Sequence, residues 1–210
     1  MTGDDRQSGS AQFRAAVRNT EGLQPWRRLF HMATGVAIAA FVSVFEPDSP
    51  IPVATLGGAL AGALLLDWIR LRSRVANTVF FRWFSALASP REAGRLASST
   101  WFLLGALAVL VIAPGRWFAP AVLVLALADP AASVVGRTWG RHRLGKGSWE
   151  GTGAFYLVAV AVLTPFAGLQ AALIAAAVVA ALEVLPSGID DNLTVPLATA
   201  LALWLVGAPR

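Results

Sequence analysis

Residues 151–182 form an uninterrupted run of 32 residues without Asp, Glu, Lys or Arg. As one straight helix this run would be about 48 Å long, whereas the hydrocarbon core of a bilayer is about 30 Å thick. Thr164, Pro165 and Gly168 lie near its middle, and Pro and Gly favour a turn there. The run therefore predicts two membrane-crossing helices joined by a tight turn.

Five more apolar segments have about the length needed to span a bilayer. They cover residues 29–45, 51–69, 96–115, 117–136 and 193–209, and Asp129 and Pro130 interrupt the fourth. Only 14% of the chain is charged, compared with about 25% in soluble domains. The predicted fold class is an all-α polytopic membrane protein with about seven transmembrane helices. Residues 26–210 would form a single transmembrane domain, after a polar tail at 1–25 that is disordered or loosely helical.

Basic residues gather on one predicted side of the membrane. Residues 1–28, the loop after the second span and the loop after the fourth span hold all Lys and Arg residues of the chain except Arg116 and Arg210. Cytoplasmic loops are enriched in Lys and Arg. The N-terminus is therefore predicted to be cytoplasmic and the C-terminus external, in a bacterial-type plasma (inner) membrane. The net charge of +5 then reflects orientation and predicts no nucleic-acid partner.

The loop after the second span has an amphipathic pattern near residues 75–88. Val75, Val79, Trp83 and Leu87 are spaced by four, and arginines flank them. This spacing predicts a helix that lies at the cytosolic membrane interface. Such a helix could simply anchor the loop, or it could gate the access of a lipid substrate.

Ionisable residues inside or at the ends of spans are costly and are functional candidates by default. The predicted topology brings seven of them to the cytosolic face: His31, Asp67, Asp129, Glu150, Glu183, Asp190 and Asp191. The chain has no cysteine and two histidines, which excludes thiol catalysis, thiolate metal sites and poly-histidine metal centres. An active site would therefore be built from carboxylates and would face the cytosol.

The densest polar stretch is residues 129–153, DPAASVVGRTWGRHRLGKGSWEGTG. Pro130 is expected to break the span and start a half-helix, whose N-terminus could receive phosphate. Small residues and six glycines follow, together with Arg137, Arg141, Arg143 and Lys146. Acids that bind a divalent cation beside bases that bind phosphate are typical of a Mg²⁺–nucleotide site. Alternatively, the bases only follow the positive-inside rule. No P-loop motif is present.

A second polar cluster is residues 183–197, EVLPSGIDDNLTVPL. Pro186 and Gly188 are expected to end the preceding helix. Asp191 or Asn192 could cap the last span, but capping would leave Glu183 and Asp190 unexplained. These acids are further candidates for the cation site.

Three sequence blocks together resemble the CTP-dependent lipid kinases, which include dolichol kinase, phytol kinase and the CTP-dependent diacylglycerol kinase. The blocks are RRLFHMATG at 27–35, the stretch at 129–151 and EVLPSGIDDNLTVPL at 183–197, with a weaker fourth, REAGRLASSTWFLLG, at 91–105. The resemblance implies transfer of the γ-phosphate of CTP to a lipid hydroxyl. It extends distantly to the phosphatidate cytidylyltransferases, but their basic K-R-x-x-K-D run and P-G-H-G-G motif are missing.

The resemblance and the polar clusters together predict roles for particular residues. The metal ligands for Mg²⁺ are Asp129, Glu183, Asp191 and Asn192. The nucleotide-binding residues are Arg137, Arg141, Arg143, Lys146, Ser133, Gly136 and Gly140. The catalytic residues are Asp129, which could take the hydroxyl proton, Lys146, and Glu150, which could bind ribose or orient Lys146. Arg28 and His31 would contact phosphate or the lipid hydroxyl.

The predicted function is therefore an integral-membrane kinase with CTP and a membrane lipid alcohol as substrates. The acceptor is left open among polyprenol, dolichol, diacylglycerol and phytol, and the oligomeric state is also open. The first alternative is a phosphatidate cytidylyltransferase that makes CDP-diacylglycerol. A non-enzymatic membrane transporter is a further alternative, although its polar groups would be expected near the bilayer midplane.

Overall fold

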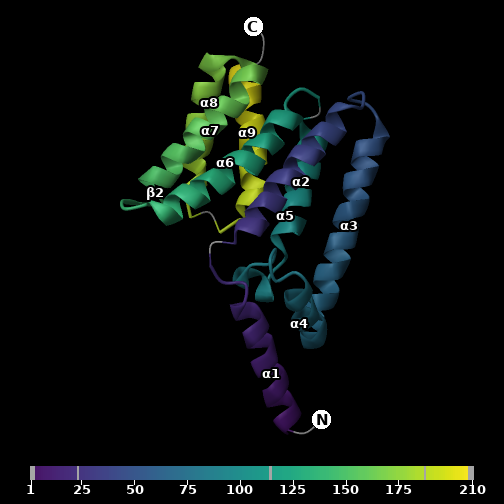
Figure 1. Ribbon diagram of the computed structural model, residues 1–210. Helices are drawn as coiled ribbons and strands as arrows, with labels where there is room; N and C mark the ends of the chain where they lie inside the picture. Colours follow the sequence, from purple (N-terminus) through teal and green to yellow (C-terminus); the bar gives the residue numbers. More distant parts are fainter. Residues whose placement is uncertain (1–2, 23, 114, 187, 208–210) are drawn as a thin grey trace.

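The computed structural model describes residues 3–22, 24–113, 115–186 and 188–207. These residues form nine α-helices, one 3₁₀ helix and a short β-hairpin (Figure 1). The elements are α1 (Gly3–Arg18), α2 (Pro25–Ser43), α3 (Pro50–Arg72), α4 (Arg74–Trp83), η1 (Pro90–Gly94), α5 (Ser98–Ile112), α6 (Phe118–Thr138), β1 (Arg143–Leu144), β2 (Gly147–Ser148), α7 (Trp149–Ala167), α8 (Leu169–Glu183) and α9 (Asp191–Gly207).

Each predicted span corresponds to one helix. These helices are α2, α3, α5, α6, α7, α8 and α9. Three of these helices, α3, α6 and α7, are long and apolar enough to cross a bilayer by length and composition. Helices α5, α8 and α9 are apolar but shorter. The structure therefore confirms a mostly helical chain with membrane-spanning candidates, and the number of seven spans stays a prediction.

The long uncharged run folds as predicted into two helices, α7 and α8. Gly168 separates them and has a φ of 78°, a conformation that glycine adopts without steric cost. Pro165 lies inside the last turn of α7 rather than in the turn itself. The break is therefore made by the glycine.

Helix α6 differs from the prediction, because it continues through Pro130 to Thr138. The expected half-helix beginning after Asp129 does not form, and its N-terminal phosphate site is absent from this part of the chain. Proline removes only one backbone hydrogen bond from a helix, and α6 is held on several sides by α2, α7 and α9. Packing therefore outweighs the cost of the proline.

The buried core surrounds α6. Val122, Leu125 and Ala126 of α6 are almost fully buried. A Cβ atom at Gly35 of α2 would overlap the side chain of Ala126. This glycine lets α2 and α6 approach closely, which brings the start of α2 near the polar end of α6.

The polar tail forms a helix in the structure, α1, which packs against α4 and extends away from the bundle (Figure 1). Phe13 contacts Phe81 edge to face, with 6.0 Å between ring centroids. The predicted amphipathic helix is shorter than expected and ends at Trp83. Val75 is 74% exposed and Trp83 is 83% exposed. These two side chains of the stripe are mostly exposed, whereas Leu87 is partly buried. The position of the stripe at a membrane surface stays a prediction.

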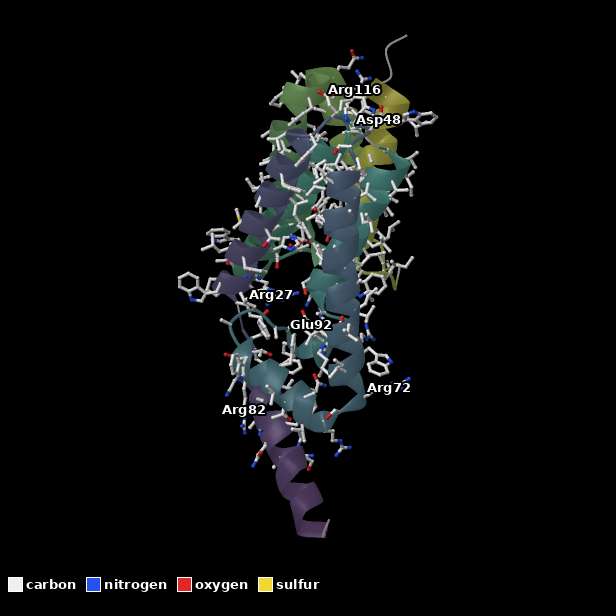
Figure 2. The ribbon with its side chains drawn as sticks, turned by 90° about the vertical axis from the view of Figure 1, so that its right-hand side faces the viewer. Arg27, Asp48, Arg72, Arg82, Glu92 and Arg116 are labelled. Atoms are coloured by element: carbon white, nitrogen blue, oxygen red, sulfur yellow. The ribbon has the colours of Figure 1, made fainter. Side chains whose placement is uncertain are left out.

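Charged residues separate along the long axis of the molecule. Arg116 and Asp48 lie at one end, and Arg72 and Arg82 lie toward the other (Figure 2). The turn between α2 and α3 and the end of α9 share the first of these ends, whereas α1 and α4 are at the second (Figure 1). The segments predicted to be external and cytosolic are thus at opposite ends.

Candidate active site

A cavity of about 1310 Å³ is lined by segments that are distant in the sequence. They are the segment before α5, the second half of α6, the β-hairpin, the start of α7 and the connection from α8 to α9. The polar stretch 129–153 and the cluster 183–197 therefore line one cavity, as predicted from their positions at the same end of the spans.

Three acids meet in this cavity. Asp129 comes from α6, Glu183 is the last residue of α8, and Asp191 is the first residue of α9. Each contributes a carboxylate oxygen, and these three oxygens lie within 4.8 Å of one another. Among the described residues this is the one such group of acidic and histidine side chains. A set of oxygen donors at this spacing fits a hard divalent cation such as Mg²⁺.

Lys146 lies against this acid group. Its ammonium forms an ion pair with the carboxylate of Asp191, and its backbone N–H donates to the carbonyl of Val184, at 3.1 Å. Gly145 has a φ of 53°, and a Cβ atom there would overlap the same carbonyl oxygen. The glycine therefore allows the tip of the hairpin to pack on the end of α8, which places Lys146 beside the acids.

The predicted small and basic residues of the 129–153 stretch line the cavity: Ser133, Gly136, Arg137, Gly140, Arg141, Arg143 and Lys146. Gly136 also faces Ser148 and Gly151 at the contact between α6 and α7. A Cβ atom at Gly140 would overlap the backbone of Gly136. The contact between α6 and α7 explains why Gly136 has no side chain, and the close approach of the chain to the end of α6 explains Gly140. Neither explanation requires a bound nucleotide.

Glu150 lies elsewhere than predicted. Its carboxylate pairs with Nδ1 of His142 at 2.8 Å, and it is not among the residues that line the cavity. Lys146 is paired with Asp191 instead. Because β1 and β2 turn the chain back on itself, His142 rather than Lys146 comes opposite Glu150. The structure therefore gives Glu150 no contact with Lys146.

Asn192 lines the cavity but is bonded to its neighbour. Its backbone N–H and its side-chain amide both donate to Oδ1 of Asp190, at 3.0 and 2.7 Å. Asp190 thus caps the start of α9. The two residues named above as possible caps, Asp191 and Asn192, do not cap it. Asp191 is left available for the acid group.

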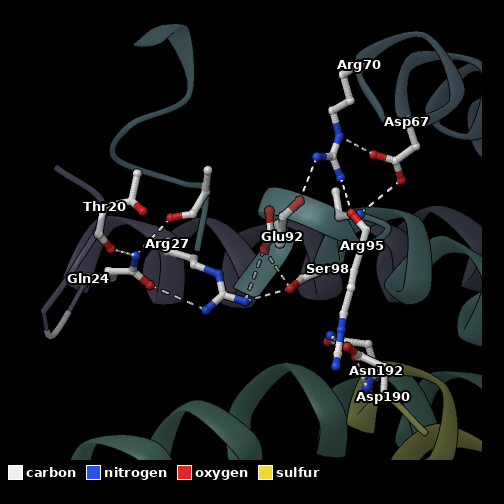
Figure 3. A network of polar contacts seen from close by, with 12 residues as sticks. Thr20, Gln24, Arg27, Asp67, Arg70, Glu92, Arg95, Ser98, Asp190 and Asn192 are labelled. Atoms are coloured by element: carbon white, nitrogen blue, oxygen red, sulfur yellow. Dashed lines mark hydrogen bonds and ion pairs between the residues drawn. The ribbon is translucent and has the colours of Figure 1, made fainter. Parts of the chain in front are cut away.

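A second set of bases also lines the cavity, and none of them was among the nucleotide-binding residues predicted above. Arg91 and Arg95 belong to the segment before α5, and Arg27 belongs to α2. The side chain of Arg95 points toward Asp190 and Asn192 (Figure 3). Arg91 and Arg95 fall in the weak block REAGRLASS, which was the only signal in the sequence that could have identified them.

Arg27 is held in place by a polar network. Its guanidinium donates to Oγ of Ser98 at 2.6 Å and lies 3.5 Å from the carboxylate of Glu92, to which Ser98 also donates (Figure 3). Burial raises the pKa of Glu92 above its usual value, and the charge of Arg27 opposes this effect. The network joins the start of α2 to the segment before α5.

Asp67 has a structural role, contrary to its inclusion among the functional candidates. It is 1% exposed and pairs with Arg70, also 1% exposed, at 2.6 Å. Asp67 accepts from the N–H of Ala97 and the hydroxyl of Thr100. Arg70 donates to the carbonyl oxygens of Glu92 and Arg95 (Figure 3). This buried ion pair therefore fixes the segment that presents Arg91, Glu92 and Arg95 to the cavity.

Arg28 and His31 line a second cavity, of about 360 Å³, and not the first one. Arg28 donates to Oγ of Ser133 at 2.9 Å. The His31 ring contacts Phe102, with 4.8 Å between ring centroids. Asp129 and Ser133 line both cavities. The two predicted substrate residues thus lie in a separate space that adjoins the acid group.

Comparison with known proteins gives one informative similarity. The chain is 29% identical to the phytol kinase of Synechocystis sp. over 224 aligned residues, which cover 93% of this chain and 86% of that protein. No family model matches the chain, and no solved structure matches it. The similarity includes most of the helices and cavity-lining segments because it spans nearly the whole chain.

Proposed function

We propose that this protein is an integral-membrane lipid kinase that transfers the γ-phosphate of CTP to the hydroxyl group of a lipid alcohol. The main support is the first cavity, where three carboxylates lie beside an ammonium group and several guanidinium groups. A divalent cation and a triphosphate need this combination of charges. The similarity to a phytol kinase over most of the chain also favours a lipid kinase.

In this proposal, Asp129, Glu183 and Asp191 would hold Mg²⁺, with Asn192 beside them. Such an ion would supply positive charge to the phosphates of the nucleotide. Lys146 and the three arginines of the 129–153 stretch would bind those phosphates, because guanidinium groups match phosphate geometry and an ammonium acts as a point charge. Positioning and charge neutralisation supply most of the catalysis in phosphoryl transfer.

The reaction forms a bond between the lipid oxygen and the γ-phosphorus of CTP. The bond between that phosphorus and its bridging oxygen breaks, and CDP leaves. The hydroxyl proton passes to a carboxylate, for which Asp129 is placed at the border of the two cavities. A loose transition state requires little assistance from a base. The main role of Asp129 toward the lipid is therefore to orient its hydroxyl group.

We also propose that seven helices, α2, α3 and α5–α9, cross the bilayer, with the N-terminus and the active site on the cytosolic side of a plasma membrane. The exposed apolar side chains of α3, such as Leu65 and Trp68, favour contact with lipid. The separation of Arg116 from Arg27, Arg72 and Arg82 along the molecule favours this orientation (Figure 2). CTP would then reach the cavity from the cytosol.

One observation favours the alternative of a phosphatidate cytidylyltransferase. A phosphatidate acceptor brings a phosphate with roughly two negative charges at neutral pH, and it needs bases beyond those that bind the triphosphate. Arg27, Arg91 and Arg95 supply such bases in the first cavity. The choice between the two reactions therefore depends on which phosphorus of CTP faces the lipid.

The proposal is tested with purified protein, γ-labelled CTP and a panel of lipid alcohols. Asp129→Asn, Glu183→Gln and Asp191→Asn should each reduce turnover at least about a hundredfold, because each removes a charged metal ligand worth several kcal/mol in the transition state. Asp48→Asn, which changes an exposed acid at the opposite end of the molecule, is the matched control and should retain activity. Near-normal turnover in any two of the three site variants would show that the metal site is wrong.

A further inference from the structure

The second cavity is lined by both apolar and polar side chains. Its apolar walls include Phe30 of α2, Phe80 of α4, Phe84 and Leu87 from the segment after α4, and Phe102 and Leu103 of α5. Its polar lining includes Asp129 and Ser133, which also line the first cavity, and the charged side chains of Arg27, Arg28, Glu92 and Arg137. An apolar space thus adjoins the acid group of the first cavity.

This apolar space reaches the molecular surface between α2 and α4. Phe30 and Phe84 line the cavity, yet they are 50% and 42% exposed. The exposed stripe formed by Val75, Val79 and Trp83 lies on the same helix as Phe80. If this stripe contacts a bilayer, an apolar chain can pass from the lipid into the cavity without crossing water.

His31 provides an unpaired hydrogen-bond acceptor beside this space. Nε2 of the ring is buried with no partner among the described residues, and the backbone of Leu125 lies close to the ring. Because a backbone carbonyl oxygen only accepts, we assign the proton of the neutral ring to Nδ1. In the neutral ring Nε2 is then an acceptor. Because buried polar atoms are almost always paired, the unpaired Nε2 points to a ligand that supplies a donor.

We propose that the second cavity binds the hydrocarbon chain of the acceptor lipid and that His31 accepts a hydrogen bond from the lipid hydroxyl through Nε2. This inference rests on the proposed function. A hydroxyl group supplies the donor that Nε2 lacks, whereas an ionised phosphate presents acceptor oxygens. His31 is thus a binding residue for an alcohol. Asp129, which also lines the phosphate-binding cavity, lines the same space as His31.

The test measures binding rather than turnover, so that it stands apart from the kinase assay. A radiolabelled long-chain isoprenoid alcohol is bound to the full chain in detergent. Leu87→Trp, which fills the cavity from a residue that does not line the first one, should weaken binding at least tenfold. Val79→Trp is the matched control, since Val79 is exposed and lines neither cavity. It should bind the alcohol as the unmodified chain does.

The role of His31 is tested with three ligands. They are the alcohol, its methyl ether, which keeps the oxygen and loses the donor, and the corresponding long-chain alkyl phosphate. His31→Phe should weaken binding of the alcohol about tenfold, the effect of one buried hydrogen bond, and should leave the ether unchanged. A cooperative thermal unfolding transition at the temperature of the unmodified chain checks that each variant is folded. Equal binding of the alcohol by unmodified, Leu87→Trp and His31→Phe chains would overturn the inference, even if γ-phosphate transfer is observed. A His31→Phe effect confined to a long-chain alkyl phosphate would overturn it as well.

Discussion

Replacement of Asp67 by Asn should strongly destabilise the protein, although Asp67 lies outside both cavities. The variant removes the charge that compensates the buried guanidinium of Arg70, 2.6 Å away. Breaking a buried ion pair by removal of one partner costs about 3–5 kcal/mol. The Asn side chain can still accept from Ala97 and Thr100, so the loss is mainly that of the unpaired charge.

For a chain of about this length, each kcal/mol corresponds to about 2–4 °C in the unfolding temperature. The expected decrease for Asp67→Asn is therefore about 6–20 °C, measured by thermal unfolding in detergent. The matched control is Arg72→Met on the same helix, where the guanidinium lies over the ring of Trp68, itself half exposed. Exposed substitutions usually change stability by less than about 0.5 kcal/mol. Equal unfolding temperatures for Asp67→Asn and Arg72→Met would refute the structural role of the pair.

Two further predictions concern the hairpin and the topology. Gly145→Ala should reduce kcat/KM for CTP, because its Cβ atom would overlap the carbonyl of Val184 and displace Lys146. The control Gly153→Ala should leave activity unchanged, because a Cβ atom there meets no atom within 4 Å. Equal activity of the two variants would contradict the placement of Lys146. Two single-cysteine variants, Asp48→Cys and Trp149→Cys, are treated in intact cells with an impermeant thiol reagent. Trp149 is exposed, and the chain has no other cysteine. Label is expected at position 48 only, and label at 149 only would reverse the orientation.

The positions of the helices were predictable from the sequence because uncharged runs are interrupted by charged or helix-breaking residues. The split at Gly168 is the clearest case, since the run is too long for one span and a flexible residue lies at its middle. The meeting of Asp129, Glu183 and Asp191 followed from the same reasoning. Once the spans alternate in direction, these three acids must lie at the same end of the helices.

Contacts between distant segments were not predictable in the same way. Pro130 was expected to break a helix on local grounds, but the packing of α6 against three helices keeps it continuous. Asp67 resembled a functional acid at a span end, and its partner Arg70, three residues later, could have indicated a structural pair. Arg27 begins the block RRLFHMATG and Arg95 lies in the weaker block REAGRLASSTWFLLG, but only the tertiary fold shows that both line the first cavity.

The most direct test of the proposed function follows the label from α-labelled and γ-labelled CTP in parallel reactions. Each reaction contains Mg²⁺ and, in turn, a polyprenol, an isoprenoid alcohol, diacylglycerol or phosphatidate. A kinase attacks the γ-phosphorus and leaves CDP, whereas a cytidylyltransferase attacks the α-phosphorus and leaves pyrophosphate; the two reactions differ in which phosphorus is in line with the lipid oxygen. We predict that label reaches a lipid alcohol from the γ position only. Transfer of α-label to phosphatidate, with none from the γ position to any alcohol, would contradict the assignment as a kinase.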